Sequence, residues 1–166
     1  MNLLRALILG GVALLALAWV NLGIFQKETL IASGEPIFLE LAPVDPRSLI
    51  QGDYMALQYA IARDLADRED LPVRGQLVLH LDGRNIATFA RLYDGQSPLA
   101  SNERLIDYQK PYYDLWLAPT SFFFEEGQGE VYQEARYAEL RLDSSGEAIL
   151  VDLRGSDLEL LEPAGP

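Results

Sequence analysis

The sequence contains no cysteine, only one histidine and only two lysines among its 166 residues. The absence of cysteine excludes disulfide bonds, thiolate metal sites and thiol nucleophiles. Basic residues are scarce as well, with 13 Lys and Arg against 25 Asp and Glu and a net charge of −12. Nucleic-acid backbones are bound by clustered positive charge, so nucleic acid is not an expected partner.

One long apolar run lies near the N-terminus. Residues 6–25 contain a single polar side chain, that of Asn21. At about 1.5 Å per residue a helix of this length spans about 30 Å, the thickness of the hydrocarbon core of a bilayer. Residues 1–26 are therefore predicted to be a cytoplasmic N-terminus and a transmembrane anchor.

The charges that flank the run predict its orientation. Arg5 and the α-amino group precede it, whereas Lys27 is followed by Glu28, Glu35 and Glu40. The positive-inside rule then places the N-terminus in the cytoplasm and the rest of the chain on the far side.

A cleaved signal peptide is the competing interpretation of the same run. The small-residue triplet 16–18 (Ala-Leu-Ala) resembles a cleavage site, but the run stays apolar up to Phe25, whereas a processed sequence usually turns polar at the cut. Both interpretations export the remaining residues.

After a linker at 27–34, residues 35–154 show the two-residue period of half-buried strands. The pattern predicts a first strand at 36–41 and a second at 54–61, forming an antiparallel pair. Two hairpins are predicted around the turn sequences 82–85 (Asp-Gly-Arg-Asn) and 143–146 (Asp-Ser-Ser-Gly).

The intervening segments carry weaker patterns. We expect a short helix or loop at 62–72, an aperiodic stretch at 93–111, a strand at 112–117, one or two helical turns at 130–136 and an acidic tail at 155–166. The fold class that follows is mainly β, with a single N-terminal transmembrane helix and a compact antiparallel β domain of six to eight strands with one short helix. The pattern does not distinguish a closed barrel from an open sandwich.

Residues 52–59 read GDYMALQY, and this segment resembles the signature of the bacterial GDYXXLXY family. The stretches 43–48 and 122–153 also look like that family. The resemblance implies a protein anchored in the bacterial inner membrane, with its domain outside the cytoplasm and its activity uncharacterised. It further implies a multi-pass membrane protein, encoded alongside, as the partner.

The residues of the motif and its preceding loop are the candidate partner-binding site. Gly52 permits a tight turn, Asp53 can accept backbone hydrogen bonds, and Arg47 can pair with an aspartate of the loop. Scaffolding of a turn and a strand is the alternative role. The candidate residues are Asp45, Pro46, Arg47, Gly52, Asp53, Tyr54, Leu57 and Tyr59.

Other chemically active residues favour structural roles. A lone strand histidine, His80, lacks the partners that a zinc site needs. The acidic residues of 64–70 lack the spacing of a calcium loop and are predicted to be solvated. Ser48 and Lys110 resemble a Ser-Lys dyad only weakly, because the lysine lies in a polar loop.

No catalytic residue, metal or cofactor is expected, and the protein is predicted not to be an enzyme. Its aromatic residues either fill the core or form an interface patch. The set is Tyr108, Tyr112, Tyr113, Trp116, Phe122, Phe123, Phe124, Tyr132 and Tyr137.

Two hypotheses of function follow. The first is a non-enzymatic accessory protein that docks to a multi-pass membrane protein. The second is an envelope hydrolase or small-ligand binder that brings together carboxylates near the motif, such as Asp53 with Glu125 or Glu126.

Overall fold

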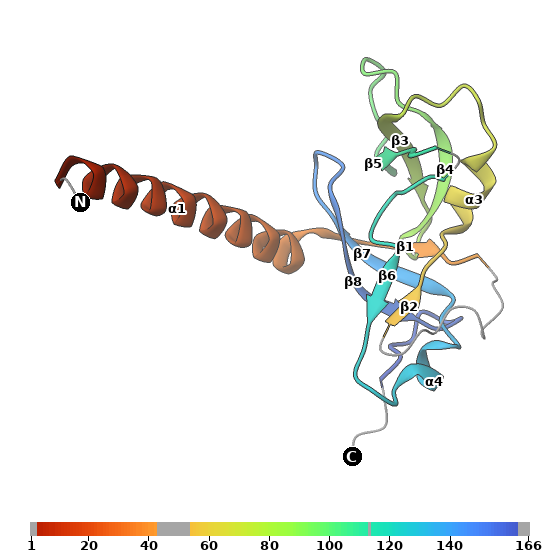
Figure 1. The fold of residues 1–166 in the computed structure, drawn as a ribbon. Helices are drawn as coiled ribbons and strands as arrows, with labels where there is room; N and C mark the ends of the chain where they lie inside the picture. Colours follow the sequence, from red (N-terminus) through yellow and green to blue (C-terminus); the bar gives the residue numbers. More distant parts are fainter. Residues whose placement is uncertain (1–2, 43–53, 113, 163–166) are drawn as a thin grey trace. The chain divides into compact units, whose positions relative to one another are not determined.

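The computed structural model describes residues 3–42, 54–112 and 114–162 (Figure 1). The chain divides into two compact units that meet in the sequence at Gly34 and Glu35. Five of the predicted site residues, Asp45, Pro46, Arg47, Gly52 and Asp53, lie outside the described residues, as does Ser48.

The first unit is one long helix, α1 (Leu3–Ser33), which is apolar on every side. Its stretch Leu7–Ser33 is long and apolar enough to cross a membrane. Asn21 donates its side-chain amide to the Leu17 carbonyl at 2.8 Å, so the polar group in the apolar run is satisfied within the helix. The helix continues through most of the predicted linker at 27–34, because residues 27–33 contain neither glycine nor proline.

The second unit is built on a curled six-stranded sheet with the order β5-β3-β4-β1-β7-β8 (Figure 1). Its strands are β1 (Glu35–Glu40), β3 (Arg74–Leu81), β4 (Ile86–Leu92), β5 (Glu103–Gln109), β7 (Tyr137–Leu142) and β8 (Ala148–Arg154). A separate two-stranded ribbon joins β2 (Tyr54–Ala56) to β6 (Ser121–Phe123). Two short helices, α3 (Ala60–Ala66) and α4 (Gly129–Tyr132), lie in the described part of the unit.

The predicted class, mainly β with an N-terminal apolar helix, is confirmed. The sheet is mixed in one pairing, because β1 runs parallel to β4 with Phe38 opposite Ile86. All other pairings in the sheet are antiparallel. The predicted pairing of 36–41 with 54–61 is wrong except for a single bridge between Leu41 and Tyr59, since β4 and β7 occupy the two edges of β1.

Both predicted hairpins are confirmed, and aspartate side chains shape their turns. Asp82 accepts hydrogen bonds from the amides of Arg84 and Ile86, each at 2.8 Å. In the second turn Asp143 accepts from the amides of residues 145, 146 and 147 at 2.8 to 2.9 Å. Because these hydrogen bonds join residues close in the sequence, the turn residues alone were enough to predict both hairpins.

The sheet curls until the second hairpin turn touches β5. The Asp107 amide donates to the Gly146 carbonyl at 2.9 Å, and the Gln76 side-chain amide donates to the Asp107 carboxylate and the Ser145 carbonyl. Gly146 has φ +103°, and a Cβ at this position would lie 3.0 Å from Asp107 and Gln76 side-chain atoms. A glycine is therefore required where the sheet comes closest to closing.

Three segments differ from their predictions. The stretch 93–111, predicted to be aperiodic, contains β5, whose Ile106 and Tyr108 are buried. Among the described residues of the strand predicted at 112–117, Trp116 alone makes a strand-like bridge, to Gln109. The predicted acidic tail is packed at its beginning, because Leu160 bridges to Arg154 and Leu161 is buried.

One buried charge lies on β7. Glu139 is 4% exposed and forms ion pairs with Arg154 and with Arg141, the latter at 3.2 Å. A buried carboxylate is tolerated only when it is paired and hydrogen-bonded, and the two arginines meet that requirement.

Candidate partner-binding groove

The motif strand alternates between the core and the surface. Met55, Leu57 and Tyr59 are 2%, 7% and 1% exposed, whereas Tyr54 and Ala56 are half-buried and Gln58 is exposed. Successive side chains of an extended segment point to opposite faces, so one short stretch serves two environments.

The inward residues of the motif hold the ribbon on the core. The Leu57 amide donates to the Thr120 carbonyl at 2.8 Å. The Tyr59 hydroxyl donates to the Pro119 carbonyl at 2.7 Å, and burial raises the pKa of Tyr59 far above its usual range. The backbone stays extended up to Tyr59, because α3 begins at the next residue. The paired strand β2 ends earlier, at Ala56, so the strand predicted at 54–61 was too long.

The outward residues Tyr54 and Ala56 line a groove of about 750 Å³, which Leu57 and Tyr59 also border. Its lining includes Ala62, Arg63 and Ala66 of α3, and Pro111, Tyr112, Asp114, Leu115 and Trp116. Ala56 and Ser121, which are partners in the β2–β6 ladder, also line it. Small side chains at these positions leave space for a bulky group from a ligand.

Aromatic rings gather along the groove. Tyr112 and Trp116 are 94% and 45% exposed, and Tyr54 lies against Phe123, itself 74% exposed, with a ring-centroid distance of 5.7 Å. Exposed Tyr and Trp side chains are enriched in protein interfaces, because each combines a large apolar surface with a polar tip. The predicted aromatic set is thus divided. Tyr108 and Tyr132 are buried, whereas Tyr112, Trp116 and Phe123 are exposed.

Two local features shape the part of the groove that contains Tyr112 and Asp114. Asp114 accepts hydrogen bonds from the Leu115 amide at 2.9 Å and from the Trp116 indole at 2.8 Å. Tyr112 has φ +56°, an unfavourable conformation for a bulky residue. The local backbone therefore holds an aromatic ring outward at an energetic cost, which is typical of functional surfaces.

The groove lining carries one charged side chain of each sign, Arg63 and Asp114, so its formal charges cancel. The Asp114 carboxylate is engaged by its own segment. Arg63, with a side chain 45% exposed, contacts only Asp64 in the described residues, at 3.4 Å. A hydrogen bond of this length between exposed side chains is weak, so the guanidinium can still bind a ligand carboxylate.

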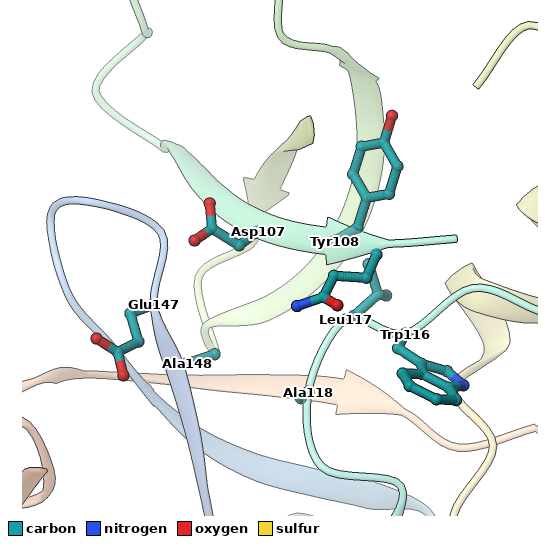
Figure 2. Close-up of a pocket in the computed structure, with 8 residues that line it drawn as sticks. Asp107, Tyr108, Trp116, Leu117, Ala118, Glu147 and Ala148 are labelled. Atoms are coloured by element: carbon teal, nitrogen blue, oxygen red, sulfur yellow. The ribbon is translucent and has the colours of Figure 1, made fainter. Parts of the chain in front are cut away.

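A second, smaller pocket of about 420 Å³ lies where the sheet comes closest to closing (Figure 2). Asp107 of β5 and Glu147 place their carboxylates on one side of it, and the Trp116 indole lies on the other (Figure 2). Asp107 already accepts a hydrogen bond from Gln76 at 2.8 Å, so part of its role is structural.

The other candidates do not converge on either site. His80 lies 2.8 Å from the Asn102 amide, and within the described residues no three His, Asp or Glu side chains are grouped as metal ligands. Lys110 donates to the Arg68 carbonyl just beyond α3, while Glu125 and Glu126 are exposed in the turn after β6. The acidic residues of 64–70 are exposed, as predicted.

Of the predicted site residues that the structure describes, Tyr54, Leu57 and Tyr59 all border the groove. Sequence reasoning missed Arg63 and Asp114, which it did not consider as site residues. Nothing in the local pattern around Arg63 distinguishes it from the arginines beside it.

A comparison with protein families matches residues 16–153 to the GDYXXLXY protein family. The chain belongs to this family. No curated protein and no solved structure matches the chain. The family match covers most of α1 and the second unit up to Leu153 in β8, and therefore includes both the motif and the groove wall at Pro111–Trp116.

Proposed function

We propose that this GDYXXLXY protein is a non-enzymatic accessory protein of the bacterial cell envelope, whose groove docks to a multi-pass membrane protein. The observation that carries the proposal is the outward half of the motif strand. Tyr54 contributes little to the core, yet it lies with Tyr112 and Trp116 along a groove with small residues between its walls. A partner that fills this groove would bury the exposed rings.

The anchor supports a partner in the same membrane. We propose that α1 remains attached, with Arg5 on the cytoplasmic side of the inner membrane and the β domain on the far side, because the positive charges precede the span. Anchoring both proteins in one bilayer raises their effective concentration, so a groove of modest affinity suffices.

The test is affinity purification of the tagged full-length protein from membranes in mild detergent. An Ala56→Trp variant fills the groove, and Thr88→Trp adds the same side chain at an exposed position of β4. A multi-pass membrane protein is expected with wild type and with Thr88→Trp, and its recovery should fall at least about tenfold with Ala56→Trp. Equal recovery from both variants would refute the proposal.

A hydrolase or small-ligand binder is the second candidate, and the pocket of Figure 2 favours it because two carboxylates line that pocket. Its expected partners of Asp53, namely Glu125 and Glu126, line neither the groove nor this pocket. If this candidate is correct, Asp107→Asn and Glu147→Gln abolish hydrolysis or ligand binding by the full-length protein. Activity that persists in both variants would remove these carboxylates from consideration.

A further inference from the structure

We infer that Tyr112 is the anchor by which this protein holds its partner, and that the partner carries a concave apolar site that receives the ring. The inference rests on the proposed function and specifies the partner surface. It begins with exposure: at 94% exposed, Tyr112 is the most exposed of the large apolar and aromatic side chains in the described residues. A ring in this position gains almost nothing from packing within its own chain.

The backbone at Tyr112 adds a second cost. Its φ of +56° lies in the left-handed region, where a bulky side chain crowds its own backbone. The described residues include two other non-glycine positions with positive φ, Asn85 and Leu158. Asparagine adopts this conformation more readily, and Leu158 is half-buried, so its side chain still packs within the chain. Of the three, Tyr112 alone combines an unfavourable backbone with a side chain that its own chain leaves uncovered.

The turn that carries Tyr112 is held in place by its own hydrogen bonds. The Asp114 amide donates to the Pro111 carbonyl at 3.2 Å. The Asp114 carboxylate accepts from the Leu115 amide at 2.9 Å and from the Trp116 indole at 2.8 Å. An aromatic ring on a fixed turn loses little conformational freedom when it binds, so more of its apolar surface contributes to affinity.

A protein surface suits this anchor better than a bilayer does. Asp114 is exposed two residues away and the chain has a net charge of −12, so anionic lipid headgroups would repel the turn. The same charge disfavours a second copy of the chain as the partner. A concave apolar site on the exported part of another membrane protein can bury the ring without this repulsion, and Tyr is enriched among the residues that anchor interfaces.

The experiment compares two variants of the tagged full-length protein in the affinity purification described above. Tyr112→Asn removes the ring and suits the left-handed backbone, whereas Tyr112→Phe keeps both the ring and the strain. With Tyr112→Asn, recovery of the multi-pass protein should fall at least about tenfold, while the midpoint of thermal unfolding in detergent stays unchanged or rises by up to about 4 °C. With Tyr112→Phe, recovery should stay within about threefold of wild type.

Leu158→Asn is the matched control, because it makes the same kind of exchange at φ +67° in a turn that does not line the groove. Its recovery of the partner should equal that of wild type. A lower unfolding midpoint for Tyr112→Asn would show that the ring stabilises the fold and would overturn its role as a strained anchor.

The outcomes separate this inference from the docking groove. If Ala56→Trp lowers recovery while Tyr112→Asn does not, the anchor is refuted and the groove stands. If neither change affects recovery, both proposals fail. With a photo-activatable phenylalanine at Tyr112, a cross-link to lipid or to a second copy of the chain, in place of another protein, would overturn the inferred partner.

Discussion

The two faces of the motif strand differ in what they contact, although their residues alternate in the sequence. Leu57 and Tyr59 are buried, and each is tied to the segment 119–120 by a hydrogen bond. Tyr54 and Ala56 line the groove and are only half-buried. The same short signature therefore supplies both the buried side chains that stabilise the β2–β6 ribbon and the side chains that line the groove. Substitutions on one face should change stability, and substitutions on the other should change binding.

The largest effect is expected on the inward face. Tyr59→Ala should lower the free energy of unfolding by about 3–5 kcal/mol, because it removes a fully buried aromatic ring and leaves a cavity. Thermal or urea unfolding of the full-length protein in detergent measures the change. A loss below about 1 kcal/mol would mean that Tyr59 is not the core residue described here.

A smaller loss is expected from Tyr59→Phe, which keeps the ring and removes the hydroxyl. The Pro119 carbonyl, on an exposed residue, loses the hydroxyl donor at 2.7 Å, and the loss of one such hydrogen bond costs about 0.5–1.5 kcal/mol. The same unfolding measurement should place Phe between wild type and Ala. If Tyr59→Phe is as stable as wild type, a water molecule replaces the hydroxyl as donor at no cost in free energy.

On the outward face, Tyr54→Ala should change stability by less than about 1 kcal/mol, since the ring packs on the exposed Phe123 and not in the core. Recovery of the membrane partner should nevertheless fall at least about tenfold. The pair of measurements sharpens the comparison, because Tyr59→Phe should show the opposite pattern. A stability loss at Tyr54 as large as that of Tyr59→Ala would erase the difference between the faces.

The smallest effect is expected away from the motif, at Asp152 of β8. Burial is the main cause that raises the pKa of the Asp152 carboxyl above the ordinary 3.8. The negative charges of Glu139 and Glu162 raise it further. A raised pKa means that the folded state favours the protonated form, so stability falls as the pH rises from the ordinary value through the raised one.

Asp152→Asn removes the ionised group while keeping an acceptor for the Leu153 amide. The variant should therefore be more stable than wild type at neutral pH, by less than about 1 kcal/mol, and the difference should shrink below about pH 4. Unfolding curves at the two pH values measure it. A variant less stable than wild type at neutral pH would show that attraction to Arg154 dominates instead.

Local signals explain how much of the fold could be predicted. The apolar helix and the two hairpins depend on neighbouring residues, through hydropathy and through the turn aspartates Asp82 and Asp143. The mixed sheet could not be predicted in the same way, because the pairing of β1 with β4 and β7 joins segments far apart in the sequence. β5 was missed because only Ile106 and Tyr108 mark its buried face.

The candidate site was predicted only where the motif itself forms it. Tyr54, Leu57 and Tyr59 were identified from the signature, but other lining residues come from α3 and from positions 111, 112 and 114–116. Arg63 and Trp116 are 53 residues apart in the sequence and line the same groove only in the folded chain. No pattern in one sequence encodes such a meeting.

The central claim is that the outward face of the motif strand binds a membrane partner. The most direct measurement is the yield of cross-linking from a photo-activatable phenylalanine at Tyr112, an exposed aromatic residue of the groove, against that from Thr88, on the exposed face of β4, in intact membranes. The account predicts one cross-linked multi-pass protein from Tyr112, absent from Thr88 and lost when Ala56→Trp fills the groove. Equal cross-linking from the two positions, or none from Tyr112, would contradict it.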